Sequence, residues 1–196
     1  MKLGRVLKAI INPIYRLFQP LYVEGLENFD MNKPFILCAN HISNWDVVAL
    51  YLACPRLINF MAKAELFKFK PLGWLLKKLG AFPVRRGEND ITAIKTAMKV
   101  LKDGEVLGIF PQGTRTDNDD DQAKGGAVLI ASKTNVPVVP AAIITEYKIF
   151  RPVRIVIGAP IDMTSDHRLS GEEIQQKADE IMKEIKILKT GAKIYG

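Results

Sequence analysis

The chain has 196 residues, of which 48% are hydrophobic and 25% are charged, and its formal net charge is +7. This composition is ordinary for one soluble globular domain that buries a substantial core. The longest uninterrupted apolar runs reach about half of the ~20 residues that a helix needs to cross a bilayer, so we expect no transmembrane span. A signal-peptide cleavage pattern is not found either.

The excess of positive charge requires an anionic partner to explain it. Nucleic acid, an anionic membrane surface and a phosphorylated substrate are the three candidates. The two cysteines, Cys38 and Cys54, lie in apolar surroundings outside any CxxC or disulfide-rich pattern. This cysteine usage predicts a reducing compartment.

The first 22 residues carry large apolar side chains at spacings of three and four, and most basic residues lie away from that stripe. The pattern predicts an amphipathic helix that includes Leu21 and is bent or interrupted near Pro13. Its apolar stripe could pack on the domain's own core or lie in a membrane interface. We therefore divide the chain into an N-terminal amphipathic segment, residues 1–24, and a domain at residues 25–196.

Apolar runs alternate with helical patterns along the rest of the chain. The runs that predict strands lie at residues 34–39, 57–62, 80–84, 106–110, 136–144 and 154–158. The helical patterns lie at residues 47–53, 91–102 (with Asn89 or Asp90 as N-cap and Ile91 on the apolar face) and 127–134, and after a capping box at residues 170–173. This alternation predicts an α/β fold, a single domain whose largely parallel central sheet is flanked by helices.

Residues 63–79 combine five lysines with five leucines, two phenylalanines and a tryptophan. A short core helix with solvated lysines is one interpretation. A surface that inserts into an anionic bilayer requires the same mixture of aromatic and basic residues. Single-stranded nucleic acid could use these side chains too, but no RNA- or DNA-binding signature accompanies them.

A polar stretch, residues 40–46, follows the first buried apolar run and carries a histidine and an aspartate five residues apart. An imidazole is the side chain best suited to take up a proton near neutral pH. A carboxylate behind it can hold the ring in one tautomer and stabilise the imidazolium. His41 and Asp46 are therefore candidates for a general base and its orienting acid, although a helix cap by Asn40 or Ser43 is an alternative.

Two further polar loops, residues 85–87 and 112–116, also follow apolar runs and place arginines beside glycines. In α/β folds the functional groups gather on loops at the carboxyl ends of the strands. A guanidinium group is well matched to phosphate. The three loops together predict a site for a phosphorylated substrate beside the His-Asp pair.

Four ordered motifs resemble those of the lysophospholipid acyltransferase family, specifically the 1-acylglycerol-3-phosphate acyltransferases. The family's NHxxxxD, its arginine-containing loop, its FPEGTR and its VPxxP strand are matched at residues 40–46, 82–87, 110–115 and 136–140, respectively. We align Arg86, not Arg85, with the arginine of the second motif. The third motif departs from the family at Gln112, where the family has glutamate.

The resemblance implies transfer of an acyl chain from a thioester, acyl-CoA or acyl-carrier protein, to the 2-hydroxyl of lysophosphatidic acid. It implies that His41, oriented by Asp46, takes the hydroxyl proton as the oxygen attacks the thioester carbonyl. It implies neither a metal nor another cofactor, and no covalent acyl-enzyme. The residues implied to bind substrate are Asn40, Arg86, Gln112, Gly113, Thr114 and Arg115.

The neutral Gln112 can hydrogen-bond the hydroxyls of the acceptor but cannot serve as a second base. The acceptor could therefore be a different lysophospholipid. Two rival functions are a thiol enzyme that uses Cys38 with the His-Asp pair, and a non-catalytic module that binds a membrane through residues 63–79. We expect a peripheral protein on the cytoplasmic face of the cell membrane, with an anionic membrane surface and no nucleic acid as partner.

Overall fold

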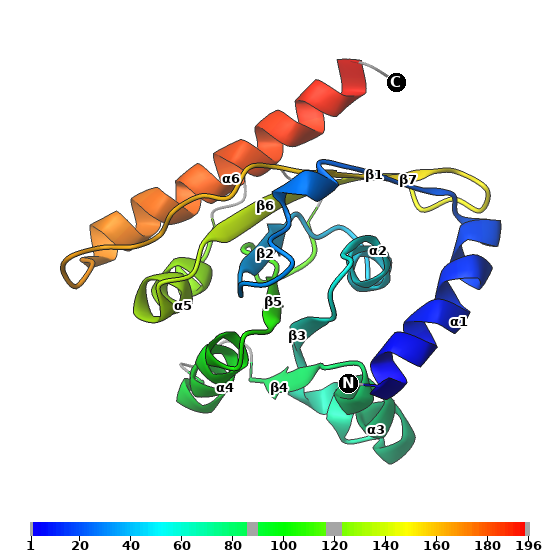
Figure 1. Cartoon of the computed structure of the whole chain (residues 1–196), viewed down its shortest axis with the longest axis horizontal. Helices are drawn as coiled ribbons and strands as arrows, with labels where there is room; N and C mark the ends of the chain where they lie inside the picture. Colours follow the sequence, from blue (N-terminus) through cyan, green and yellow to red (C-terminus); the bar gives the residue numbers. More distant parts are fainter. Residues whose placement is uncertain (1, 86–89, 117–122, 195–196) are drawn as a thin grey trace.

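A seven-stranded sheet forms the centre of the protein in a computed structural model that describes residues 2–85, 90–116 and 123–194 (Figure 1). The strands are β1 (Leu21–Glu24), β2 (Ile36–Ala39), β3 (Ile58–Lys63), β4 (Phe82–Val84), β5 (Val106–Ile109), β6 (Val138–Ile144) and β7 (Val153–Ile157). They lie in the order β1-β7-β6-β2-β5-β3-β4, and only the β6–β7 pair is antiparallel. The predicted single α/β domain with a largely parallel sheet is confirmed.

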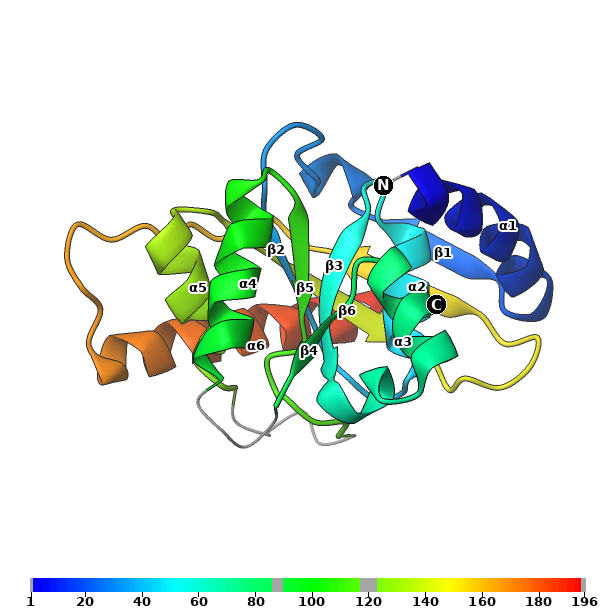
Figure 2. The same cartoon turned by 90° about the horizontal axis from the view of Figure 1, so that it is seen from below.

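Helices cover both faces of the sheet, so that the central strands β2, β5 and β6 are buried on both sides. The helices are α1 (Lys2–Phe18), α2 (Trp45–Ala53), α3 (Lys70–Lys78), α4 (Ile91–Lys102), α5 (Gly126–Thr134) and α6 (Gly171–Ile194), with short 3-10 turns at η1 (Leu26–Asn28) and η2 (Ala64–Phe67). Leu37 and Ala39 of β2 face a core shared with α1 and α2, whereas Ile36 and Cys38 face a core shared with α4, α5 and α6. Figures 1 and 2 show these two layers, with α6 running along the outer face of its layer.

The N-terminal helix is shorter than predicted, and most of its apolar stripe is exposed, which excludes packing of that stripe on the core. It runs through Pro13 without interruption and ends at Phe18. The prediction was wrong for Leu21, which begins strand β1; β1 pairs in parallel with β7, a partner some 130 residues away. Tyr15 is buried in the core and Ile11 packs against it. Most of the apolar stripe is exposed instead, and its exposed members are Val6, Ile10, Ile14, Leu17 and Phe18.

Residues 63–79 form η2 and α3, and this segment does not contribute a core helix. Only Gly73 of α3 is buried, while Phe69 and Trp74 are 67% and 57% exposed. The interpretation as a short core helix is therefore wrong. Among all the described helices, α1 and α3 included, none is long and apolar enough to cross a membrane.

The predicted ends of α4 and α6 are correct in the described part of the chain. Asp90 is the N-cap of α4 and accepts a hydrogen bond from the backbone N–H of Ala93, while Ile91, predicted on the apolar face, is 63% exposed. Ser170 and Glu173 form the predicted capping box, with reciprocal hydrogen bonds between side chains and backbone N–H groups. Helix ends follow from local contacts, so local sequence was sufficient to place them.

Candidate active site

The loop after β2 is fastened to the neighbouring strand β6 by Asn40. The side-chain oxygen of Asn40 accepts from the backbone N–H of Ile143 (2.7 Å), and its side-chain NH2 donates to the carbonyl of the same residue (3.0 Å). Asn40 is 3% exposed. We expected Asn40 to bind substrate. In the structure, its two hydrogen bonds to Ile143 instead fix the point at which the loop leaves the sheet.

His41 and Asp46 form the predicted pair. Nδ1 of His41 lies 2.8 Å from Oδ2 of Asp46, and the two residues are 5% and 0% exposed. The backbone N–H groups of Ile42 and Ser43 donate to the same Oδ2, at 2.7 and 2.8 Å, and Asp46 lies in the first turn of α2 where the helix dipole favours a negative charge. The arrangement directs an N–H at Nδ1 toward the carboxylate and leaves Nε2 without a hydrogen-bond partner among the described residues.

The third motif holds the backbone and the ring of the histidine. The ring of Phe110 stacks on His41 with 3.9 Å between the ring centroids. Oε1 of Gln112 accepts from the backbone N–H of His41 at 3.2 Å, and the carbonyl of His41 accepts from the N–H of Thr116 at 2.9 Å. A glutamate at position 112 could accept the same bond, so the departure from the family motif preserves this contact.

Tyr147 contacts the pair from the connection between β6 and β7, and the sequence contained no signal for it. Its hydroxyl donates to Oδ1 of Asp46 at 2.5 Å. Burial and the negative charge of Asp46 raise the pKa of Tyr147, so the phenol stays protonated and remains a donor. Burial, together with a smaller contribution from the negative charge of Asp46, raises the pKa of Tyr15 on α1 to about 12. The buried hydroxyl of Tyr15 has no hydrogen-bond partner among the described residues.

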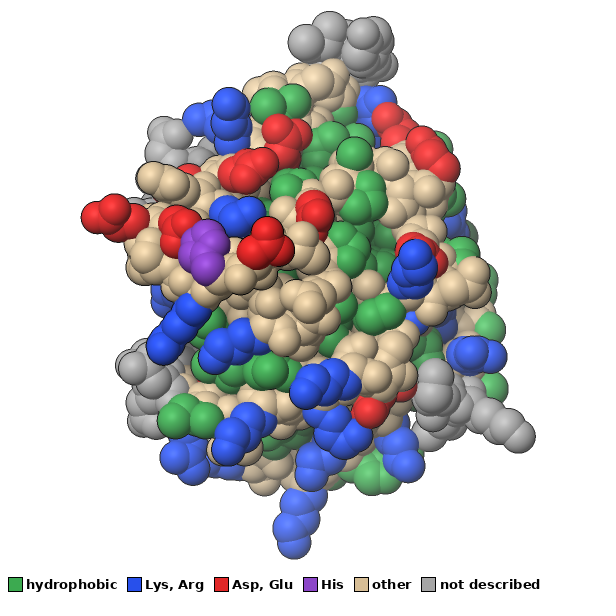
Figure 3. Space-filling view, turned by 60° about the vertical axis from the view of Figure 1, so that its left-hand side comes forward, with side chains coloured by type: hydrophobic (Ala, Val, Ile, Leu, Met, Phe, Trp, Pro, Cys, Tyr) green, Lys and Arg blue, Asp and Glu red, His purple; other side chains and the backbone are tan. Residues whose placement is uncertain are grey.

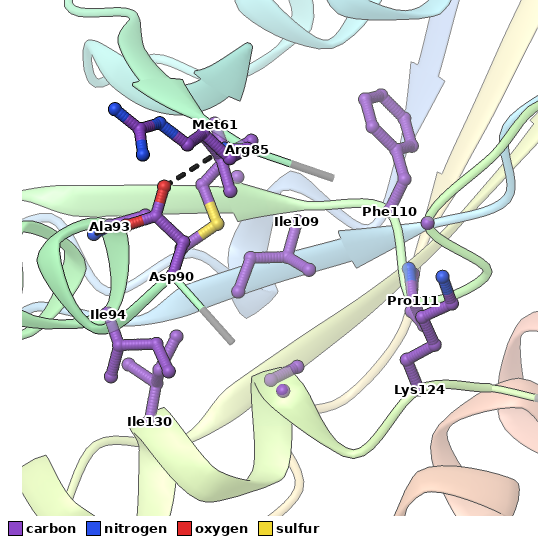
Figure 4. A pocket seen from close by; sticks show the side chains of 15 residues that line it. Met61, Arg85, Asp90, Ala93, Ile94, Ile109, Phe110, Pro111, Lys124 and Ile130 are labelled. Atoms are coloured by element: carbon purple, nitrogen blue, oxygen red, sulfur yellow. Dashed lines mark hydrogen bonds between the residues drawn. The ribbon is translucent and has the colours of Figure 1, made fainter. Parts of the chain in front are cut away.

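A cavity of about 430 Å³ begins at Phe110, the residue that stacks on His41. Its walls are mostly apolar and come from the carboxyl ends of β3, β4 and β5 and the first turns of α4 and α5. Figure 4 shows Ile94, Ile109 and Ile130 facing one another, with Phe110 and Lys124 at the other end. His41 and Asp46 do not line the cavity themselves, so Phe110 is what connects this apolar compartment to the His-Asp pair.

Cationic side chains lie at this edge of the sheet, and two of them were not among the predicted site residues. Arg115 and Thr114 are exposed beside Gly113, whose φ is +74°. Arg86, the predicted arginine of the second motif, lies outside the described residues. Arg85 and Lys124 line the cavity, and a Cβ added at Gly113 would come within 3.1 Å of Nζ of Lys124. Lys124 was missed because it stands alone ahead of a helix and matches none of the motifs that we quoted.

The thiol alternative is disfavoured by the position of Cys38. The side chain is fully buried in the core that β2 shares with α4, α5 and α6, and burial raises the pKa of its thiol far above neutrality. Phe35 to Ala39 are buried on both faces, as expected for a central strand. Among the described residues there is also no group of three or more His, Cys, Asp or Glu side chains that could hold a metal ion.

Known proteins resemble this chain over most of its length. A sequence model of the family described as Acyltransferase matches residues 20–144. The 1-acyl-sn-glycerol-3-phosphate acyltransferase of Bacillus subtilis is 39% identical over 158 residues, which are 77% of this chain and 78% of the relative. The protein of the same name from Streptococcus pneumoniae is 35% identical over 84% of this chain and 63% of the relative.

The fold also resembles a solved structure. The crystal structure of the 1-acyl-sn-glycerophosphate (LPA) acyltransferase PlsC from Thermotoga maritima matches with a TM-score of 0.72 and 29% sequence identity. The match covers 96% of this chain and 82% of that one. The resemblance therefore extends over almost the whole of this chain.

Proposed function

The chain belongs to the acyltransferase family, and we propose that it moves a fatty acyl chain from an acyl thioester to the 2-hydroxyl of 1-acylglycerol-3-phosphate, giving phosphatidic acid. The relatives named above carry this acceptor in their names. The observation that carries the proposal is the buried hydrogen bond between His41 and Asp46, which leaves Nε2 free beside an apolar cavity.

The reaction begins with proton transfer to His41. Nε2 removes the proton of the 2-hydroxyl as that oxygen forms a bond to the thioester carbonyl carbon. The imidazolium is stabilised by Asp46, whose carboxylate lies against the other ring nitrogen. The tetrahedral intermediate then loses its C–S bond, and the imidazolium returns the proton to the departing thiolate. The transfer is direct and uses neither a metal nor another cofactor; the donor thiol is that of CoA or of acyl-carrier protein.

The apolar cavity has the place and the size for an acyl chain. Its volume, about 430 Å³, lies within the roughly 300–1,000 Å³ of small-molecule sites. Because Phe110 lines it and also stacks on His41, a chain in the cavity would have its carboxyl end near Nε2. The residues that narrow the cavity would then set the preferred chain length.

The acceptor's phosphate needs cations at the edge of the sheet, where Arg115 is exposed and Lys124 lines the cavity. With Arg86, these residues would hold the phosphate and so orient the 2-hydroxyl toward His41. Gly113 lets the backbone approach the ligand, with Thr114 beside it. The neutral Gln112 favours one second candidate, a different lysophospholipid acceptor, because a buried amide in place of a carboxylate changes which hydroxyls and charges the site accepts.

A membrane surface would deliver the acceptor lipid. The exposed apolar stripe of α1 is continued by Phe150 and Ile149 in the β6–β7 connection, which lies beside α1 in Figure 1. Trp45, one residue before Asp46, is 55% exposed, and its ring lies 6.4 Å from that of Tyr15. Exposed aromatic and aliphatic side chains next to a site for an anionic lipid suit a peripheral protein at the cytoplasmic face of the cell membrane.

Positive charge is also gathered unevenly over the molecule. Figure 3 shows Lys and Arg side chains over the lower part of one face and acidic side chains above them. Lysines interleave with the exposed Phe69 and Trp74 of the α3 region as well. Such patches attract an anionic bilayer, at roughly 1 kcal/mol for each cation near the surface.

Replacement of His41 tests the proposal. His41→Ala should abolish acyl transfer to lysophosphatidic acid, measured with acyl-CoA and acyl-carrier protein donors, while His167→Ala serves as a control because this exposed histidine lies far along the chain in the connection to α6. The same assay with other lysophospholipids determines the acceptor. Retained turnover in His41→Ala would overturn the role proposed for His41. A wild-type protein without turnover, whose binding to anionic vesicles survives His41→Ala and is lost when the lysines between residues 63 and 78 are replaced, would instead support a non-catalytic membrane-binding module.

A further inference from the structure

The carboxylate of Asp46 is held at both of its oxygens. Oδ2 lies 2.8 Å from Nδ1 of His41 and accepts from the backbone N–H groups of Ile42 and Ser43. Oδ1 accepts from the hydroxyl of Tyr147, which is 101 residues away in the sequence. The local chain alone therefore fixes one oxygen, and a distant side chain fixes the other.

We propose that Tyr147 is a positioning residue for acyl transfer, which orients Asp46 toward His41 and shares the negative charge of its carboxylate. The inference rests on the proposed function, since it takes His41 as the general base. A carboxylate with one oxygen unbound can rotate about its terminal torsion, which is broad for this side chain. The phenol removes that freedom.

The backbone around Tyr147 is built to place the hydroxyl. The φ of Tyr147 is +47°, a left-handed conformation that is uncommon for a bulky residue, and its N–H donates to Oγ1 of Thr145 at 3.0 Å. Three residues later the N–H of Phe150 donates to the carbonyl of Phe18 at the end of α1 (2.7 Å). A strained residue that persists at a candidate active site is over-determined by its surroundings, here at both sides of the turn.

The titratable side chains that face Asp46 come from three elements: His41 from the loop after β2, Tyr147 from the β6–β7 connection and Tyr15 from α1. Burial and the charge of Asp46 raise the pKa of both tyrosines, that of Tyr15 to about 12. Both phenols are therefore neutral wherever the enzyme works. Of these side-chain types, imidazole is the general base that enzymes use near neutral pH.

This arrangement fixes the sign of the effect on catalysis. A phenol that donates to Oδ1 draws negative charge away from the oxygen that faces His41. Without the phenol, the carboxylate stabilises the imidazolium more strongly, so His41 stays protonated to a higher pH and is unavailable as a base there. The acid limb of the pH profile of kcat/KM must then move to higher pH, which a merely structural tyrosine would not cause.

The test compares three full-length proteins. Tyr147→Phe keeps the ring and loses the hydroxyl; kcat should fall about 10-fold with the KM values for both substrates nearly unchanged, and the acid limb should move up by about 0.5–1 pH unit. Incorporating 3,5-difluorotyrosine at position 147, a more acidic donor, should move the limb the opposite way. Tyr51→Phe is the matched control, because its buried hydroxyl donates to the carbonyl of Gly4 and not to the His-Asp pair.

Opposite shifts for the two changes at position 147, with no shift for Tyr51→Phe, support the inference. A profile that moves in neither protein, with kcat equal to that of Tyr51→Phe, overturns it even though His41→Ala is inactive. An active His41→Ala protein overturns the proposed function and the inference with it. If Tyr147→Phe melts far below the wild type, the difluorotyrosine protein is the test, because it keeps the hydroxyl. A shift of its acid limb to lower pH supports the inference, and no shift overturns it.

Discussion

Replacing Asp46 with asparagine removes one negative charge and preserves the shape of the side chain. The amide oxygen can take the place of Oδ2 and accept the three N–H bonds that converge there from His41, Ile42 and Ser43. The amide NH2 then faces Tyr147, whose hydroxyl oxygen can accept in place of donating. We therefore expect Asp46→Asn to fold, at a cost of about 1 kcal/mol in the free energy of unfolding.

The loss of charge acts on the imidazolium that forms in the reaction. Nδ1 lies 2.8 Å from the carboxylate oxygen, which places the centres of the two charges about 4 Å apart. At an effective dielectric constant of about 20, unit charges at this separation attract by about 4 kcal/mol. Each ~1.4 kcal/mol corresponds to a factor of ten in rate, so we expect kcat to fall about 10³-fold.

The assay is steady-state acyl transfer to lysophosphatidic acid, with thermal unfolding followed by circular dichroism on the same protein. Asp103→Asn is the control, because Asp103 forms an exposed ion pair with Lys99 at the far end of α4. A kcat for Asp46→Asn within tenfold of the wild-type value, in a protein that is folded, would refute the role that we give to the carboxylate.

Three further changes test other parts of the structure. Tyr15→Phe removes a buried hydroxyl that has no partner among the described residues, so thermal denaturation should show a free energy of unfolding about 1 kcal/mol higher; a decrease would mean that the hydroxyl is satisfied. Hydrogen bonds from Ser170 and His167 lower the pKa of Glu173 to about 2, and the stability that comes from a lowered carboxyl pKa is lost as the pH falls. Glu173→Gln should therefore melt below the wild type above pH ~4.5 and at the same temperature as the wild type below pH ~2. A difference in melting temperature that does not change with pH would contradict this. Ala127→Leu extends a side chain into the cavity and should shift donor preference toward shorter acyl chains in a competition assay, whereas an unchanged preference would place the acyl chain elsewhere.

The His-Asp pair could be predicted because its contacts are local. His41 and Asp46 lie five residues apart on one strand-to-helix turn, and the two N–H groups that hold Asp46 lie between them. Tyr147 could not be predicted, because it reaches Asp46 only through the return of the chain from β6 toward β7. Periodicity carries no information about such a contact, and residues 145–152 contain no motif.

The same reasoning explains the errors at the N-terminus. Strand β1 has four residues, and its hydrogen-bond partner β7 lies near the other end of the chain, so the helical spacing of the preceding residues was extended through Leu21. The apolar stripe of α1 was read correctly, but a stripe does not tell which surface it meets. In the structure Tyr15 and Ile11, both outside the stripe, make contacts with the core.

The reversal of strand direction at β7 explains how Tyr147 reaches the active site. Parallel strands need a long crossover between them, whereas β6 and β7 are antiparallel and are joined by a short connection. That connection leaves β6 at its carboxyl end, the same edge at which the loop after β2 carries His41. It is held at Asp46 by Tyr147 and at α1 by the N–H of Phe150. Inserting or deleting a residue between Tyr147 and Phe150 would break either the hydrogen bond to Asp46 or the one to Phe18. The length of this connection is therefore fixed by the two contacts at its ends.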